Sequence, residues 1–420
     1  MKFHEIKLPH TIIHCAVPTA LLATCLVILA AVILPDDRKP LLPPVATDGG
    51  NNLSSSCNIF KGEWVPDPDA PRYTAETCPV IHGHYDCMRY GRPDLGFARW
   101  RWRPADGCEL PRLNASRFLR ASSGKSMAFV GDSLARNQMH SLVCLLARAE
   151  TPSPWTRTNA TAAAGHTYYR FARHRFTVAS FWSPFLVRAA EVDPANGPAP
   201  APAKRSGAGL WSLDLDEADD WWAAAARAGE FDYVVVSAGS WFFRPSVFHE
   251  CGRLIGCNGC QAPNVTDTTL RYPLRKAFRT ALRAAAAGGG RRRGRVSRTV
   301  VVRTISPSHY ENGTWNGDGD CARTRPLGRG EWEMNVVEKE IHAIQAEEFE
   351  EAARSTEQGN GVRMMLLDAT EAMAQRPDAH PSKYRLWQPD RFNVSRDCLH
   401  WCLPGAMDAC NDMLLHMLLH

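Results

Sequence analysis

A serine at the start of a predicted helix is the residue in this sequence best placed to act as a nucleophile. Residues 126–130 have the pattern of a buried strand, Gly131-Asp132-Ser133 forms a sharp turn, and a helix is expected over residues 134–149. Such a turn presents the Ser133 hydroxyl at the edge of a sheet, where backbone N–H groups can stabilise an oxyanion. The simpler interpretation is that Ser133 only caps the helix.

The segment Asp397-Cys-Leu-His-Trp-Cys402 supplies the two groups that a serine nucleophile needs. Asp397 precedes His400 by three residues, so one turn can place both side chains on one face. An imidazole takes the serine proton, and a carboxylate fixes the tautomer of that imidazole. Ser133, His400 and Asp397 are therefore a candidate triad. The alternative is a structural turn held by Cys398 and Cys402.

Three other patterns in the sequence are weaker evidence for a functional site. A phosphate loop at Gly124-Lys125-Ser126 is excluded because Leu119 stands where its first glycine is required. The arginine-rich segment 284–298 could contact an acidic glycan or phospholipid, but it is typical of a solvated linker. A zinc site is the third, although disulfides are favoured in this chain and no metal is expected. Its candidate ligands would be His249, Cys251, Cys257 and Cys260.

The cysteines and the N-terminus indicate a chain of the secretory pathway. Twelve of the 14 cysteines lie between Cys57 and Cys410, which indicates an oxidising compartment. Residues 11–34 are uncharged and mostly apolar, long enough as a helix to cross roughly 30 Å of hydrocarbon, and longer than a cleaved signal peptide requires. Lys2 and Lys7 favour a cytosolic tail over residues 1–10. We expect a single-pass type II membrane protein.

The rest of the chain is expected in the lumen. Residues 35–56 are rich in Pro, Gly, Asn and Ser and predict a flexible stem. The lumenal placement agrees with six sequons for N-glycosylation. They begin at Asn52, Asn114, Asn159, Asn264, Asn312 and Asn393. The small surplus of 49 Lys and Arg over 44 Asp and Glu indicates no nucleic-acid partner.

Two regions are predicted after the stem. Residues 57–122, called the cap below, hold four cysteines and many turn residues. Residues 123–420 form the body, with further strands at 231–237, 299–305 and 362–368 and helices at 270–287 and 332–353. This alternation predicts an α/β fold whose mostly parallel sheet is covered on both faces. The low-complexity segments 193–209 and 284–298 are expected to be surface loops.

From about Cys57 to its end, the sequence resembles the plant trichome birefringence-like proteins, which are Golgi polysaccharide O-acetyltransferases. The blocks FVGDSLARNQ around Ser133 and DCLHWCLPG around His400 carry the resemblance. The stretches SFWSPFLVRA, FDYVVVSAGSWFFRP, SPSHYENGTW and RPDAHPSKY connect them. The resemblance implies an SGNH-hydrolase-like α/β/α sandwich and a catalytic triad of Ser133, Asp397 and His400.

The resemblance also implies how eight cysteines pair. The expected disulfides are Cys57–Cys108, Cys78–Cys144, Cys87–Cys402 and Cys321–Cys398. The last two would hold the acid–histidine turn and so pre-organise the base. The pairing of Cys251, Cys257, Cys260 and Cys410 stays open.

The sequence departs from the wider SGNH pattern at the oxyanion site. It has no convincing Gly-X-Asn-Asp block to supply an asparagine. Gly239, which follows the strand at 231–237, is a candidate for the glycine block. Arg136 and Asn137 are candidates to orient the acetyl donor or the glycan, with a packing or surface role as the alternative for each.

The implied activity is transfer of an acetyl group, through an acetyl-serine, to a hydroxyl of a plant hemicellulose. Xyloglucan is the expected acceptor, with mannan or xylan as alternatives. No tightly bound cofactor is expected; acetyl comes from acetyl-CoA, a lumenal carrier or an acetyl-supplying membrane protein. A polysaccharide acetylesterase and a non-catalytic glycan-binding protein are the other functions considered. The implied location is the Golgi membrane, with the catalytic part in the lumen.

Overall fold

The computed structural model describes residues 57–155, 166–193, 197–198, 209–259, 265–287, 298–315, 317–357, 361–386 and 396–419. The predicted tail, anchor and stem lie outside these residues, as do most of the arginine-rich segment and the sequons at Asn52, Asn159, Asn264 and Asn393. Within the described ranges, no helix is both long and apolar enough to cross a membrane. The asparagines of the other two sequons, Asn114 and Asn312, are exposed.

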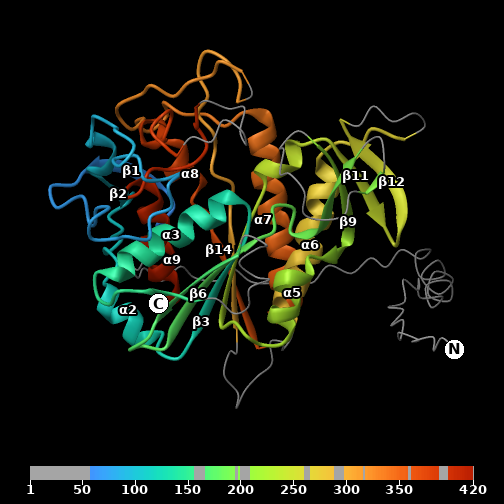
Figure 1. The fold of residues 1–420 in the computed structure, drawn as a ribbon, viewed down its shortest axis with the longest axis horizontal. Coiled ribbons are helices and arrows are strands. Elements are labelled where there is room, and N and C mark those ends of the chain that lie inside the picture. Colours follow the sequence, from blue (N-terminus) through green and yellow to red (C-terminus); the bar gives the residue numbers. More distant parts are fainter. Residues whose placement is uncertain are drawn as a thin grey trace, which may run out of the picture. The chain divides into compact units, whose positions relative to one another are not determined.

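A seven-stranded sheet forms the centre of the body (Figure 1). Its first five strands run parallel, the sixth pairs antiparallel with the fifth, and the seventh pairs antiparallel with the sixth, so the predicted mostly parallel sheet is confirmed. In spatial order the strands are β14 (Val362–Leu367), β13 (Arg298–Arg303), β10 (Tyr233–Ser237), β3 (Ser126–Gly131), β6 (Phe176–Trp182), β5 (Thr167–Phe171) and β4 (Ser153–Pro154).

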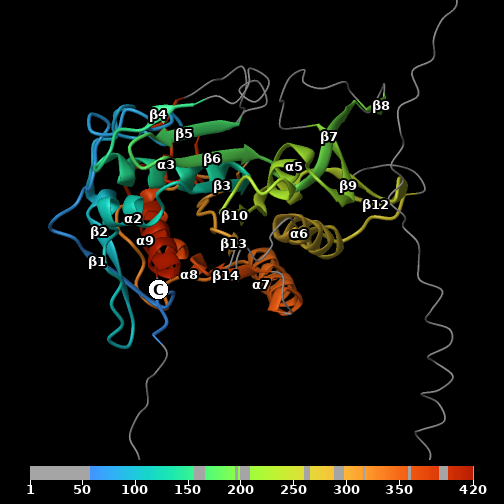
Figure 2. The ribbon, with the colours of Figure 1, turned by 90° about the horizontal axis from the view of Figure 1, so that it is seen from below.

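Helices cover both faces of this sheet because its strands are apolar on both sides. In β3, Met127 and Phe129 join one hydrophobic core, whereas Ala128 and Val130 join the other. Figure 2 shows one group of helices on each side of the sheet. The first group is α2 (Ala115–Ala121), α3 (Ser133–Ala147) and α9 (Ala406–Leu419); the second is α5 (Asp220–Arg227), α6 (Arg271–Ala286) and α7 (Val336–Glu357).

The predicted helix at 332–353 begins four residues later than expected, and a capping box explains its start. The side chain of Asn335 accepts the Glu338 N–H at 2.9 Å, and the Glu338 carboxylate accepts the Asn335 N–H at 3.2 Å. This reciprocal pair satisfies N–H groups that have no partner inside the helix. The helix α7 therefore begins directly after Asn335.

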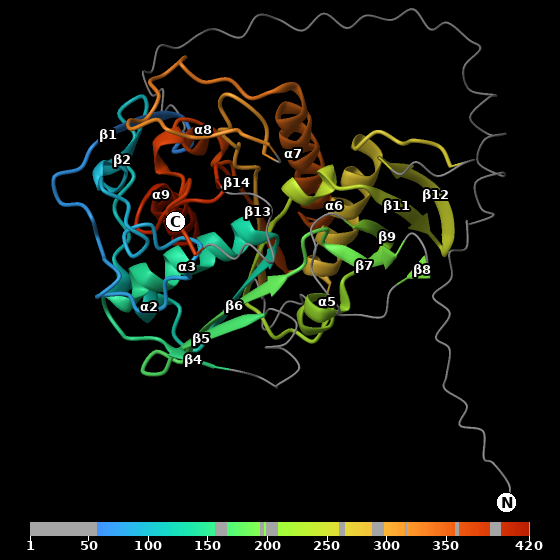
Figure 3. The ribbon, with the colours of Figure 1, turned by 45° about the horizontal axis from the view of Figure 1, so that its top comes forward.

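A second sheet was not predicted from the sequence. It has five strands and lies at the opposite end of the body from the cap strands (Figures 1 and 3). In spatial order they are β12 (Arg253–Asn258), β11 (Ser246–Glu250), β9 (Leu210–Ala218), β7 (Val187–Asp193) and β8 (Gly197–Pro198). The segment 193–209, predicted as a loop, contributes β8, and most of it lies outside the described residues.

The cap shares a hydrophobic core with the body. Its strands β1 (Gly62–Pro66) and β2 (Trp100–Pro104) pair so that Trp64 faces Trp102, and both side chains join the core of α3 and α9. The indole N–H of Trp64 donates to the carbonyl of Ala372 at 2.7 Å, in the short helix α8 (Thr370–Ala374). The cap is thus part of the scaffold beneath the C-terminal segment.

Four disulfides fasten the cap and the C-terminal segment. They are the pairs that the family resemblance implies: Cys57–Cys108, Cys78–Cys144, Cys87–Cys402 and Cys321–Cys398. Cys251 and Cys257 are each disulfide-bonded, which argues against zinc at these thiols. Cys410 is a buried free thiol.

Candidate active site

The turn before α3 places Ser133 at the carboxyl end of β3. A side chain at Gly131 would put its Cβ 1.7 Å from the carbonyl oxygen of Ser237, so only glycine fits there. The Asp132 carboxylate accepts the N–H of Leu134 at 2.9 Å and caps the helix. The interpretation of Ser133 as the N-cap is therefore wrong, because Asp132 has that role and Ser133 is the first helical residue.

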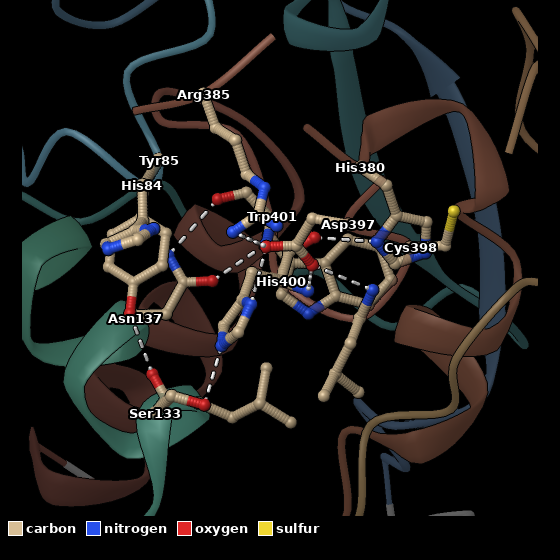
Figure 4. Close-up of polar contacts among 12 residues, drawn as sticks. His84, Tyr85, Ser133, Asn137, His380, Arg385, Asp397, Cys398, His400 and Trp401 are labelled. Carbon is tan, nitrogen blue, oxygen red and sulfur yellow. Dashed lines mark hydrogen bonds and ion pairs between the residues drawn. The ribbon is translucent and has the colours of Figure 1, made fainter. Parts of the chain in front are cut away.

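The structure brings the three predicted triad residues into one hydrogen-bonded series (Figure 4). Nε2 of His400 lies 2.6 Å from Oγ of Ser133, and Nδ1 of His400 lies 2.8 Å from Oδ2 of Asp397. Since the carboxylate only accepts, Nδ1 carries the ring proton and Nε2 is free to accept from the serine hydroxyl. The side chain of His400 is 19% exposed, so a substrate can approach it.

Asp397 is buried yet ionised. Burial by itself raises its pKa, but the charge and hydrogen bonds of His400 and the nearby guanidinium of Arg385 outweigh this and hold the pKa of Asp397 well below its usual range. An Arg385 nitrogen lies 3.8 Å from Oδ2 of Asp397. The carboxylate also accepts the backbone N–H groups of Leu399 and His400, at 3.2 and 3.0 Å. A permanently charged acceptor thus faces the imidazole.

Asn137 is buried and binds the backbone beside His400. Its side chain is fully buried and makes two hydrogen bonds to Trp401. The N–H of Trp401 donates to Oδ1 at 2.9 Å, and Nδ2 donates to the carbonyl of Trp401 at 3.2 Å. Both ends of the amide are occupied, which favours the packing alternative over the predicted role in orienting donor or glycan.

Arg136 lies beside the nucleophile and is partly exposed. Its Nε donates to the hydroxyl of Tyr85 at 3.4 Å, and its guanidinium lies over the ring of Trp182 at 5.4 Å from the centroid. Tyr85 in turn donates to the carbonyl of Ser133 at 3.0 Å. Among the described residues, Arg136 has no carboxylate partner, so its charge is available to a ligand.

Gly239 lies in the loop after β10, next to the nucleophile turn because β10 pairs with β3. The following residue, Ser240, donates its hydroxyl to the Asp132 carboxylate at 3.1 Å. A side chain at Gly239 would approach Ile341 to 3.3 Å. Burial raises the pKa of Asp132. The Gly239 loop is therefore fastened to the turn, and its role at an oxyanion stays a prediction.

Several neighbours of the triad were not found from the sequence. Tyr85 and His84 come from the cap, and Arg385 follows β14 by 18 residues. Burial is the main cause that lowers the pKa of His84 to about 4, and the charges of His400 and Arg385 add to it. No local pattern marks these residues, because only the folded chain brings the cap to α3. The predicted Cys87–Cys402 bridge was the sequence signal that could have placed Tyr85 near the triad. Cys87 lies two residues beyond Tyr85, and Cys402 lies two residues beyond His400.

A serine, a histidine and a carboxylate in series at the carboxyl edge of a parallel sheet define an α/β protein equipped for acyl transfer through serine. The family described as the GDSL/SGNH-like acyl-esterases found in Pmr5 and Cas1p matches residues 110–417, and the PMR5 N-terminal domain matches residues 55–109. These two matches, together with the similarity to the plant proteins described next, show that the chain belongs to the trichome birefringence-like family of PC-esterases.

Plant proteins are among the similar sequences. Trichome birefringence-like 19 of Arabidopsis thaliana is 44% identical over 365 residues, which are 86% of this chain and 81% of the relative. Xyloglucan O-acetyltransferase 2 of the same plant is 37% identical, over 86% of this chain and 83% of the relative. Xyloglucan O-acetyltransferase 4 of Populus trichocarpa is 38% identical, over 86% and 81%.

Proposed function

We propose that this protein is an O-acetyltransferase that acetylates hydroxyls of a plant hemicellulose through an acetyl-serine intermediate. The carrying observation is the series in which His400 lies 2.6 Å from Ser133 and 2.8 Å from Asp397. A glycan-binding protein without catalysis would need no such series. The names of two relatives as xyloglucan O-acetyltransferases support transfer as the outcome.

The first half-reaction loads the serine. Oγ of Ser133 attacks the acetyl carbonyl carbon of the donor while Nε2 of His400 accepts the hydroxyl proton. The negative oxygen faces the first turn of α3, where N–H groups lack intrahelical partners, and the Gly239 loop adjoins it. The bond to the donor's leaving group then breaks, and His400 gives the proton to that group. Acetyl-Ser133 remains.

The second half-reaction transfers the acetyl group to the sugar. His400 Nε2 accepts a proton from the acceptor hydroxyl, whose oxygen attacks the carbonyl carbon of acetyl-Ser133. The Ser133 Oγ–carbon bond breaks, and Oγ takes the proton back from His400. Asp397 stays ionised throughout and stabilises each imidazolium that forms.

Xyloglucan is the acceptor that we propose, with mannan and xylan as alternatives. Support comes from the two relatives named for xyloglucan, although the names of relatives with 44% and 41% identity state no acceptor. The guanidinium of Arg136 is partly exposed beside Trp182 and has no carboxylate partner among the described residues, so it suits hydrogen bonding to sugar hydroxyls or to an acidic donor. We propose acetyl-CoA, a lumenal carrier or an acetyl-supplying membrane protein as the source of acetyl.

The proposed location is the Golgi membrane, as a single-pass type II protein with the triad in the lumen. Its support is the sequence of residues 11–34 together with the disulfides that stabilise the cap. Protease protection in sealed microsomes tests this topology. The triad region should be degraded only after the membrane is opened.

The activity is tested by incubating the full chain in detergent with labelled acetyl donor, with and without oligosaccharides of xyloglucan, mannan or xylan. Acetylated oligosaccharide supports the transferase, and the best acceptor identifies the hemicellulose. Free acetate as the main product despite acceptor would identify an acetylesterase, which uses the same triad with water in place of the sugar. Glycan binding with neither product would identify a non-catalytic protein.

A further inference from the structure

Two histidines lie in series behind the triad histidine. Nδ1 of His380 lies 2.6 Å from the carbonyl oxygen of His400, and Nε2 of His380 lies 2.6 Å from Nδ1 of His309. At the far end, Nε2 of His309 lies 2.9 Å from the carbonyl oxygen of Ala374. His380 is 1% exposed, and its ring stacks on Trp401 with centroids 4.2 Å apart. Three contacts thus connect Ala374 to the backbone of His400.

This series requires more protons than two neutral rings possess. A carbonyl oxygen only accepts, so each terminal contact needs an N–H, and the central contact needs a third. A neutral pair has two. It can therefore make the central contact together with only one of the terminal contacts. In one tautomer His380 donates to the carbonyl of His400, and in the other His309 donates to the carbonyl of Ala374.

The surroundings of His309 and His380 favour the neutral pair, which has two ring N–H protons, over the cationic pair, which has three. Burial lowers the pKa of His380 well below its usual value and is the main cause that lowers the pKa of His309 to about 4. Asp378 and Glu311 raise the pKa of His309, and Arg323 lowers it, without reversing the shift. Asp378 is moreover paired with the buried Arg376 at 2.8 Å. Near neutral pH the choice between the two tautomers therefore decides whether His380 donates a hydrogen bond to the carbonyl of His400.

We propose that His380 is a positioning residue that holds the backbone of His400, and that His309 selects the tautomer of His380 that can do so. The proposal rests on the role given to His400 above. When His309 donates from Nδ1, Nε2 of His380 accepts and Nδ1 carries the proton toward His400. A displacement of about 1 Å between base and nucleophile can lower a rate about 100-fold. The hydrogen bond from His380 to the backbone of His400 therefore bears directly on catalysis.

Backbone contacts hold the same segment independently of the two imidazoles. The N–H of His309 donates to the carbonyl of Cys398 at 3.0 Å, and the N–H of Cys402 donates to the carbonyl of Ala379 at 2.9 Å. Replacing the side chains of His309 and His380 leaves these bonds, and the disulfides at Cys398 and Cys402, in place. Substitutions at the pair therefore test positioning in a segment that keeps its other supports.

The first test compares two replacements of His380 in the full chain. In His380→Asn, the amide nitrogen stands where Nδ1 stood and can donate to His400; His380→Leu has similar bulk and no donor. We expect the asparagine variant to keep kcat within about threefold of the wild type, and the leucine variant to lose about 10- to 100-fold in kcat with KM unchanged. Wild-type kcat in His380→Leu would overturn the proposal. It would also be overturned if His380→Asn were as stable as His380→Leu and had an equally low kcat.

The second test asks whether His309 acts through His380. His309→Leu should lower kcat about tenfold in the wild type and less than twofold in the His380→Asn background, where no tautomer remains to be selected. His309→Asn keeps a donor toward His380 and should remain active. Equal losses from His309→Leu in both backgrounds would refute the selection of a tautomer. This cycle also decides the question if His380→Leu fails to fold.

A parallel Ser133→Ala variant separates this proposal from the proposed function. If Ser133→Ala still transfers acetyl, the triad assignment fails, and with it the role of His400 that the positioning requires. If Ser133→Ala is inactive while His380→Leu keeps full kcat, the triad stands and only the positioning role fails. Thermal unfolding of every variant shows whether a lost rate reflects lost structure.

Discussion

Oγ of Ser133 and Nε2 of His400 lie 2.6 Å apart although 267 residues separate them in the chain. The serine is fixed by a strand–turn–helix unit, and the histidine by a segment without regular secondary structure. Asn137 joins the two units, because it lies on α3 and binds the backbone of Trp401. The catalytic geometry therefore depends on contacts that are remote in sequence.

Replacing Ser133 by alanine should abolish acetyl transfer and leave the fold intact. Loss of a serine nucleophile lowers kcat by roughly 10⁴- to 10⁶-fold in enzymes of this type, because no acyl-enzyme can form. The side chain is 8% exposed and small, so the melting temperature should hardly change. Ser123→Ala, at an exposed serine, is the matched control. Near wild-type transfer by Ser133→Ala would contradict the mechanism.

Replacing Asp397 by asparagine should reduce kcat by about 10⁴-fold, because the amide no longer enforces the tautomer in which Nδ1 of His400 carries the proton. The asparagine retains an oxygen for the N–H groups of Leu399 and His400, so the turn should persist. Steady-state kinetics measure the loss of kcat, and thermal unfolding shows whether the fold persists. An active Asp397→Asn variant would mean that the carboxylate does not orient the base.

The buried histidines should contribute stability that rises as the pH increases from 4 to 7. Burial is the main cause that lowers the pKa of His140 to about 3 and that of His84 to about 4. The unfolded chain, with ordinary histidine pKa values near 6.5, binds more protons than the folded chain below that pH. This stabilisation is complete above about pH 6.5 and is lost as the pH falls toward the pKa values that these histidines have in the folded chain.

Replacing His140 by phenylalanine should flatten this dependence. The ring of His140 is 3% exposed and accounts for about one proton, or about 1.4 kcal/mol per pH unit, between its two pKa values. Urea unfolding at pH 4.5 and pH 7 measures the difference. An unchanged slope in His140→Phe would show that His140 is not the neutral buried group that its surroundings indicate.

The sequence indicated the triad because two short blocks carry its chemistry, and it indicated the main sheet because β3, β10 and β13 are continuous apolar runs. The second sheet was missed for a physical reason. Residues 213–216 of β9 alternate buried leucine with aspartate, which is typical of a half-buried strand. Four residues do not specify partners, and β7 and β11 pair with β9 only through tertiary contact.

Contacts near the site were hard to predict for a similar reason. Arg136 and Asn137 are neighbours in the chain, and no pattern around them separates their roles. On the helix they point in different directions, so Arg136 reaches Trp182 while Asn137 is directed into the core. His380 stood within a recognised motif, yet its contact with the carbonyl of His400 involves backbone, which no residue type reveals.

Removing the Cys87–Cys402 disulfide should impair both stability and catalysis. The bridge joins residues 315 apart and ends two residues from His400, so its loss frees the segment that carries the base. We expect Cys87→Ala with Cys402→Ala to destabilise the fold by about 2–5 kcal/mol and to lower kcat at least about tenfold.

The Cys57–Cys108 disulfide is the matched control, because it joins two cap residues 51 apart in the chain. Its removal should destabilise the fold with kcat unchanged at temperatures where the variant stays folded. Equal kcat in the two double variants would show that Cys87–Cys402 supports the fold only. A greater loss of kcat after removing Cys57–Cys108 would contradict the proposed role of the bridge near His400.

Arg136 and Asn137 should differ when each is replaced. Asn137→Leu leaves the buried N–H and carbonyl of Trp401 without partners, at a cost of about 1–3 kcal/mol each, and should lower both stability and kcat. Arg136→Gln removes a partly exposed charge and should leave stability within about 0.5 kcal/mol while raising KM for donor or acceptor. Kinetics with each substrate varied in turn show which one Arg136 binds. Unchanged KM values for both substrates would exclude Arg136 from binding, and a fully active, stable Asn137→Leu would show that the hydrogen bonds to Trp401 do not position His400.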